Sequence, residues 1–200
     1  MNQSKNVILI DNFDSFTHNL LHLLQTVRPQ YSFTIYRNHD NELLNQTPDA
    51  LIVGPGPMTP AETGLLKLYF EQTVVKKQIP TLGVCLGMQF LGWYFGIGVT
   101  RSTLPAHGTA TDIEHAESDI FQNIPTPTQG ARYNSLEIQV AELNRQTILT
   151  GLAFAPENNA VMALRHSVEP WIGVQFHPES FLTSHGHLLI ENFFRKYVEI

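Results

Sequence analysis

Short apolar runs alternate with helical stripes in the first half of the chain. Val7 to Ile10 are apolar in succession, which predicts a buried strand over residues 6–11. From Phe16 to Val27 the apolar residues recur at helical spacing, and we expect Asp14 or Ser15 to cap this helix. The same patterns predict strands at 32–37, 50–54 and 81–84, and helices at 62–77 and 86–95. Alternation of this kind predicts an α/β fold with a largely parallel sheet flanked by helices.

The second half of the chain has a different pattern, with short β-like runs separated by turn residues. We expect mixed or antiparallel strands here, some of them extending the main sheet. The predicted strands are 108–113, 136–140, 147–154, 160–166 and 171–176. A final apolar stripe predicts a helix at 186–197.

Three groups of polar, glycine and cysteine residues lie where predicted strands end. They are Asp11 to Phe16, Gly54 to Pro57, and Cys85. In an α/β sheet, ligands bind outside the carboxyl ends of the strands. We therefore expect these groups to meet at one site.

Composition limits the classes of function. Two hundred residues with 42% hydrophobic and 15% charged residues suit a single domain, residues 1–200. A net charge of −6 argues against nucleic-acid binding, and the first apolar run is too short to cross a membrane. The single cysteine permits no internal disulfide, which suits a cytoplasmic protein. The histidine spacings complete no metal-binding set, so we expect neither a metal nor a cofactor.

Cys85 is the candidate nucleophile. It stands between a predicted strand and a predicted helix, and Gly83 and Gly87 flank it. Small neighbours permit a sharp strand-to-helix turn that exposes one side chain, and a helix N-terminus favours a thiolate. His177 and Glu179 alternate on a later segment, so they can point the same way and supply a base and its orienting carboxylate. A lone cysteine is more often a small buried hydrophobic residue, so the two glycines and the His-x-Glu pair are needed for this interpretation.

The motifs resemble those of class I (triad-type) glutamine amidotransferases. Gly83-Val-Cys-Leu-Gly-Met-Gln89 and Phe176-His-Pro-Glu-Ser180 carry the resemblance. Asp11 to Asn19, Pro55 to Pro60 and Arg132-Tyr-Asn-Ser-Leu136 narrow it to component II of anthranilate synthase and aminodeoxychorismate synthase. The resemblance spans nearly the whole chain and implies a flavodoxin-like fold.

The resemblance also implies a role for each motif residue. Cys85, His177 and Glu179 would form the catalytic triad that hydrolyses glutamine to glutamate and ammonia. The backbone N–H groups of Leu86 and Gly56 would form the oxyanion hole. The implied glutamine contacts are Gly56, Pro57, Met58, Gln89, Ser135 and Leu136. Taken alone, Gly54 to Pro57 would be interpreted as a turn, Gln89 as a solvent-facing helix residue and Ser135 as a turn residue.

The chain departs from the family pattern at three positions. Met58 stands where the family usually has glycine, and Met88 and Asn134 stand where histidine is frequent. If position 58 needs a positive φ, methionine strains it; if it needs only room, the loop shifts outward. Because no triad group is lost, we expect the chemistry to survive.

By this resemblance, the partner is a chorismate-binding synthase subunit that receives the ammonia. We expect it to cover the mouth above Cys85, contacting the loops near Phe13 and Arg132 and the segment 180–186. The product, anthranilate or 4-amino-4-deoxychorismate, stays open. Three alternatives remain: the glutaminase subunit of imidazole glycerol phosphate synthase, a free γ-glutamyl hydrolase, and a catalytically silent interaction subunit.

Overall fold

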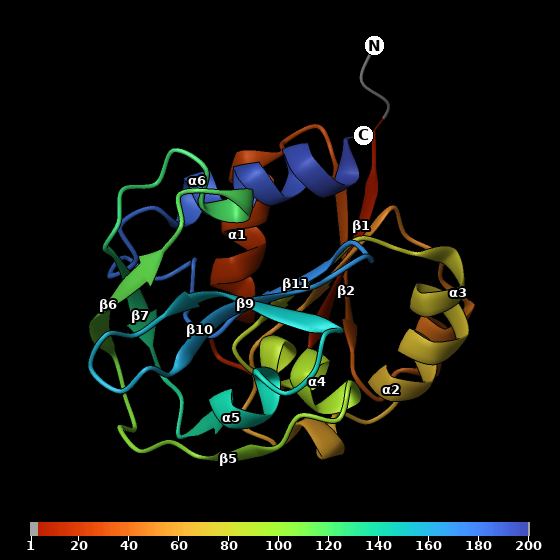
Figure 1. Ribbon diagram of the computed structural model, residues 1–200. Coiled ribbons are helices and arrows are strands. Elements are labelled where there is room, and N and C mark those ends of the chain that lie inside the picture. The colour runs from red at the N-terminus through yellow and green to blue at the C-terminus, as the bar shows by residue number, and fades with distance from the viewer. Residues whose placement is uncertain (1–3, 200) are drawn as a thin grey trace.

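A nine-stranded sheet runs through the computed structural model, which describes residues 4–199 (Figure 1). Its strand order is β2-β1-β3-β4-β11-β10-β9-β6-β7. The parallel part comprises β2 (Ser32–Arg37), β1 (Asn6–Asp11), β3 (Ala50–Val53), β4 (Thr81–Val84) and β11 (Trp171–Val174). The antiparallel part comprises β10 (Val161–His166), β9 (Leu149–Phe154), β6 (Thr109–His115) and β7 (Thr128–Arg132). The predicted α/β fold, with antiparallel strands extending the sheet in the second half, is confirmed.

Helices cover both faces of the sheet (Figure 1). On one face, α1 (Thr17–Val27) and α6 (Gly186–Phe193) pack against Val7 and Leu9 of β1. On the other, α2 (Leu66–Tyr69) and α4 (Leu86–Tyr94) pack against Ile8 and Ile10. Alternate residues of β1 thus enter separate cores, which is why its apolar run is unbroken. Among residues 4–199, no helix combines the length and apolar character that crossing a membrane requires.

The predicted helix at 62–77 is wrong as a single element. The segment forms a 3₁₀ turn at Pro60–Glu62, then α2, a π-helical turn at Phe70–Val74 and α3 (Val75–Lys77). Gly64 has φ +58, and the Leu65 N–H donates to the carbonyl of Asn38. This close approach bends the chain before α2 begins. The apolar residues expected to face inward are buried or half-buried: Leu65, Leu66, Tyr69, Phe70 and Val74. The apolar pattern therefore identified the buried face of this segment but not the points at which the helix is interrupted.

The predicted cap of the first helix is also wrong. Phe16 occupies the N-cap position of α1 and makes no side-chain capping bond. Asp14 instead accepts from the backbone N–H of Phe16, and Asp11 accepts from the Thr17 hydroxyl at 2.8 Å. The acidic side chains therefore shape the turn before the helix.

Two strands were absent from the sequence prediction. One is β7, and the other is β5 (Val99–Arg101), which pairs with β8 (Leu136–Ile138) in a separate two-stranded sheet. The three residues of β5 are too few for a period to show, and β7 contains Gln129, Gly130 and Arg132. A short helix, α5 (Val140–Leu143), follows β8, and a π-helical turn at Phe194–Val198 extends α6. The other predicted bounds differ from the observed ones by at most two residues, apart from α6 and its π-helical extension.

Candidate active site

Cys85 occupies a strained turn between β4 and α4. Its φ is 54° and its ψ is −102°, a conformation that non-glycine residues rarely adopt. Its N–H donates to Val174 O at 2.8 Å, and its carbonyl accepts from the Gln89 N–H at 3.1 Å. These two bonds tie the turn to β11 and to the helix, so the surrounding structure maintains the strain.

The two flanking glycines permit close backbone contact around this turn. A Cβ on Gly83 would lie 2.4 Å from the carbonyl of Gly87, and a Cβ on Gly87 would lie 2.2 Å from Val53 O. Both distances are well inside van der Waals contact. The glycines therefore let α4 sit directly on β3 and β4, and the positive φ falls on the cysteine itself.

His177 and Glu179 form a buried pair on the segment after β11. Nδ1 of His177 lies 2.6 Å from Oε1 of Glu179, and the two side chains are 2% and 0% exposed. The backbone N–H of His177 donates to Ala131 O of β7 at 2.9 Å. The rings of Phe16 and Tyr133 pack edge-on against the imidazole, at 5.5 and 5.0 Å between centroids. These contacts fix the ring and keep water from it.

The pKa of His177 is raised from 6.5 to about 10. Burial, the largest influence, lowers it, but interactions with Cys85 and Glu179 together outweigh burial. Nε2 of His177 is buried and makes no hydrogen bond to another residue of the described chain. At neutral pH the imidazole of His177 is therefore protonated and carries a positive charge beside the carboxylate of Glu179.

Leu86 directly follows Cys85, and Gly56 lines the same cavity as Cys85. Leu86 is the first residue of α4, where N–H groups have no partner within the helix. A Cβ on Gly56 would lie 2.6 Å from Asn12 Cβ and 2.9 Å from the Leu86 side chain. Asn12, fully buried, holds this loop because its amide donates to Gly54 O at 2.9 Å. Glycine at position 56 thus allows the loop to approach the head of α4.

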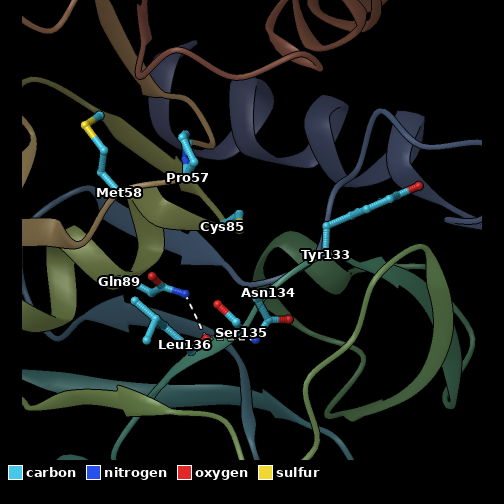
Figure 2. Close-up of a pocket in the computed structure, with 9 residues that line it drawn as sticks. Pro57, Met58, Cys85, Gln89, Tyr133, Asn134, Ser135 and Leu136 are labelled. Atoms are coloured by element: carbon cyan, nitrogen blue, oxygen red, sulfur yellow. Dashed lines mark hydrogen bonds between the residues drawn. The ribbon is translucent and has the colours of Figure 1, made fainter.

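One cavity joins the predicted substrate contacts (Figure 2). It opens to solvent, and its empty space, counted together with the solvent at its mouth, is about 340 Å³. The cavity is lined by Gly56, Pro57, Met58, Cys85, Gln89, Tyr133, Asn134, Ser135 and Leu136. All six residues predicted to contact glutamine, together with the candidate nucleophile, therefore meet in one place.

Met58 is accommodated without backbone strain. The described residues with a positive φ do not include it. Its half-buried side chain points away from Gln89 and Ser135 (Figure 2). Position 58 therefore needs no left-handed conformation here, and methionine leaves the cavity open.

Sequence reasoning missed two residues of the site. Tyr133 lines the cavity and packs edge-on against the ring of His177, and the Gln175 amide donates to the Cys85 sulfur at 3.6 Å. Gln175 could have been found, because side chains at 175, 177 and 179 alternate to one side of an extended segment. Tyr133 lies within the motif Arg132 to Leu136, but its role could not be assigned from the sequence, because the residues that it contacts are distant along the chain.

The side chain of Arg132 is buried, although we expect its loop to contact a partner. It is 2% exposed, and its guanidinium donates to Asn134 Oδ1 and Leu104 O, both at 3.0 Å. Its loop can approach a partner, but the arginine side chain supports the cavity wall instead. Residues 4–199 contain no group of three or more His, Cys, Asp or Glu side chains that could hold a metal ion.

Comparison with known proteins places this geometry in a family. The model of the family "Glutamine amidotransferase class-I" matches residues 8–197. The chain belongs to the class I glutamine amidotransferases. The resemblance seen in the motifs is confirmed, and with it the assignment of the chain as a glutamine amidotransferase.

Relatives within this family point to one branch. The chain is 37% identical to anthranilate synthase component 2 of Azospirillum brasilense, over 94% of each chain. It is 36% identical to aminodeoxychorismate/anthranilate synthase component 2 of Bacillus subtilis, over 96% of each. It is 34% identical to the bifunctional protein TrpGD of Thermotoga maritima, matching 94% of this chain and 32% of that longer protein.

Solved structures share the fold. The structure of a putative GMP synthase component from Thermoplasma acidophilum superposes with a TM-score of 0.83 at 22% identity, covering 98% of this chain and 94% of that one. A glutamine amidotransferase from Thermotoga maritima gives 0.77 at 16% identity, covering all of both chains. At these identities the likeness concerns the architecture alone.

Proposed function

We propose that this chain is the glutamine-hydrolysing subunit of a chorismate-using synthase, with Cys85, His177 and Glu179 as its catalytic triad. The observation that carries the proposal is the strained cysteine at the head of α4, opening into a cavity that also contains Gln89 and Ser135. Curated relatives named as component 2 of anthranilate and aminodeoxychorismate synthases support the choice of partner. We further propose that residues 1–200 act as one cytoplasmic amidotransferase domain.

The chemistry follows from where the proton resides. The Cys85 thiolate attacks the side-chain amide carbon of glutamine, and the C=O bond opens to an oxyanion. The N–H groups of Leu86 and Gly56 donate to that oxyanion. His177 gives its proton to the amide nitrogen, ammonia leaves and a thioester remains. The imidazole then takes a proton from water, whose attack on the thioester releases glutamate and the sulfur.

Glu179 keeps His177 in a working orientation. Its carboxylate accepts from Nδ1–H, which leaves Nε2 as the nitrogen that exchanges protons with the substrate. Both side chains are buried, so the pair needs no solvent molecule to keep its geometry. The carboxylate also stabilises the charged ring, consistent with the raised pKa of His177.

Glutamine would bind along the cavity wall opposite Met58. Gln89, Ser135 and Leu136 present polar side-chain and backbone groups there, and Gly56 and Pro57 close the side nearest Cys85. The simpler interpretations, Gln89 as a solvent-facing residue and Ser135 as a turn residue, lose support. Both residues line the cavity, and Gln89 is buried.

The alternatives gain less support. The three relatives above carry anthranilate, aminodeoxychorismate or TrpGD names, which favours the chorismate branch over imidazole glycerol phosphate synthase. A silent subunit would have no need of a strained cysteine facing a cavity. The TrpGD relative suggests that such a domain can also occur within a longer chain. Which chorismate product is made, or whether both are, is decided by the partner.

The decisive test replaces the sulfur in the reconstituted complex. Cys85→Ser, assembled with an anthranilate-forming or aminodeoxychorismate-forming synthase subunit, should lose glutamine-dependent product and keep ammonia-dependent product. Retained glutamine dependence would exclude Cys85 as the nucleophile. If the unmodified chain assembles with neither subunit and hydrolyses γ-glutamyl peptides alone, the free hydrolase is the better assignment.

A further inference from the structure

A continuous row of hydrogen bonds leads from a buried guanidinium to the sulfur of Cys85. Arg132 Nε donates to Asn134 Oδ1 at 3.0 Å, and Asn134 Nδ2 donates to Leu136 O at 2.8 Å. Gln89 Nε2 donates to the same carbonyl at 3.0 Å and to Gln175 Oε1 at 3.0 Å. Gln175 Nε2 then donates to Cys85 Sγ at 3.6 Å.

The direction of every bond in this row is fixed by chemistry. A guanidinium can only donate and a carbonyl can only accept. The Asn134 amide must therefore present its oxygen to Arg132 and its nitrogen to Leu136 O. Leu136 O likewise requires that Gln89 face it with Nε2. That nitrogen also meets Gln175, which must therefore present Oε1 to it. The Gln175 amide is left with Nε2 toward the sulfur.

Gln175 is well built for such a contact. Its side chain is fully buried, and its backbone N–H donates to Met162 O at 2.9 Å. A buried amide without partners would cost about 1–3 kcal/mol, so both ends need the bonds they make. A donor held against a sulfur favours the anionic form of that sulfur, because hydrogen bonds to charged groups are stronger than those to neutral groups.

We propose that Gln175 is a further catalytic group of the amidotransferase site: its amide N–H holds the Cys85 thiolate, and its amide oxygen orients Gln89 toward the substrate. This rests on the proposed nucleophilic role of Cys85. With Nε2 of Gln89 occupied by Leu136 O and Gln175, Oε1 of Gln89 remains as the acceptor in the cavity. One buried amide thus links the nucleophile to a substrate contact.

The test measures the sulfur directly, without glutamine or a partner. Alkylation of Cys85 by iodoacetamide in the isolated chain reports the thiolate, and Cys85 is the sole cysteine. Gln175→Met keeps the side-chain length and removes both polar ends. We expect alkylation at pH 7 to slow by about tenfold, the effect of losing one hydrogen bond to a charged group. The midpoint of its pH dependence should move upward.

A matched control separates this effect from general loosening. Gln146 is also a glutamine with a bonded amide, which donates to Leu143 O and Leu149 O in the loop before β9. Gln146→Met should lower the melting temperature and leave Cys85 alkylation unchanged. If Gln146→Met slows alkylation as much as Gln175→Met, or if Gln175→Met folds and alkylates like the unmodified chain, the proposal is overturned.

A second variant keeps the test informative if Gln175→Met does not fold. Gln175→Glu retains an oxygen that accepts from Gln89 Nε2 and replaces the donor beside the sulfur. Above the pH at which the new carboxyl ionises, its charge should slow alkylation further than the loss of the donor alone. In the reconstituted complex Gln175→Glu should lower kcat for glutamine more than it raises KM, whereas Gln175→Met should change both.

The two hypotheses fail in different ways. If Cys85→Ser keeps glutamine-dependent activity, the proposed nucleophile is wrong, whatever the alkylation shows. If Cys85→Ser is inactive and Gln175→Glu alkylates with the pH dependence of the unmodified chain, only the role of Gln175 is wrong.

Discussion

At the scale of single residues, the site depends on a few backbone positions that leave little room. Cys85 adopts φ 54°, and Gly56 lies so close to Asn12 and Leu86 that a Cβ would collide with both. Strain and close approach of this kind are retained where function needs them. Substitutions that add or remove only a few atoms at these positions should therefore alter catalysis strongly, although they change little buried surface.

Gly56→Ala is expected to lower kcat for glutamine about 100-fold, the usual effect of losing one oxyanion donor. The added methyl would lie 2.6 Å from Asn12, so the loop must move and its N–H with it. Steady-state kinetics in the reconstituted complex would show this, with ammonia-dependent activity as the control. An unchanged kcat would mean that the Gly56 N–H does not contact the oxyanion.

His177→Ala is expected to lower kcat by more than Glu179→Ala does. The imidazole transfers the proton and typically contributes a factor of about 10²–10⁴, whereas the carboxylate acts on the ring's orientation and charge. Comparison of kcat for both variants at one pH tests the order. Equal or reversed losses would contradict the assigned roles.

At the scale of elements, the segment between β3 and β4 shows how a tertiary contact interrupts a helical pattern. Leu66, Tyr69, Phe70 and Val74 recur at helical spacing and are all buried. Yet the chain passes through a 3₁₀ turn, a bend at Gly64 and a π-helical turn. The bend arises because Gly64 lies against Asn38, whose side chain in turn donates to Asn12.

Gly64→Ala should destabilise the fold more than Gly96→Ala. Both glycines have a positive φ, +58 and +83, so both variants carry the left-handed strain of about 1–2 kcal/mol. At Gly64 the new methyl would also lie 2.6 Å from Asn38 O, whereas nothing lies within 4 Å at Gly96. Urea unfolding of both variants measures the difference. If both variants lose the same unfolding free energy, the chain near Asn38 moves to admit the new methyl group at little cost.

At the scale of the whole molecule, the buried triad couples stability to pH. The pKa of His177 is raised from 6.5 to about 10 in the folded chain, so folding favours the protonated ring. Its contribution to stability is complete below pH 6.5 and is lost as the pH rises through about 10. Oε2 of Glu179 and Nε2 of His177 are both buried, and neither makes a hydrogen bond to any of residues 4–199.

We therefore expect the free energy of unfolding to decrease between pH 7 and pH 9.5, and to decrease less steeply in Cys85→Ser. The serine variant lacks the sulfur that helps raise the pKa of His177. Chemical unfolding at several pH values, with the reducing agent kept constant, gives both slopes. If the unfolding free energies of the unmodified chain and of Cys85→Ser decrease equally with pH, Cys85 does not contribute to the raised pKa of His177.

Much of this molecule could be predicted from local pattern. The bounds of β1 and β4 follow from apolar runs, because a strand's burial is recorded in its own residues. The position of Cys85 between β4 and α4 follows from the glycines at 83 and 87. Met58 could be recognised as a departure, but only the backbone shows that position 58 adopts no positive φ.

The sequence by itself determined which residues are apolar on which face, where one strand gives way to a helix, and which motif residues carry reactive groups. Tertiary structure alone decided that Leu136, Gln89 and Gln175 form a row of hydrogen bonds that ends at the Cys85 sulfur. It also decided that Tyr133 and Phe16 pack against His177 and that Arg132 turns inward. The reason is physical: periodicity records the burial of an element, whereas contacts between distant segments depend on how the whole sheet is assembled. The Gln89–Leu136 contact joins residues 47 positions apart, and the Gln175–Cys85 contact joins residues 90 apart.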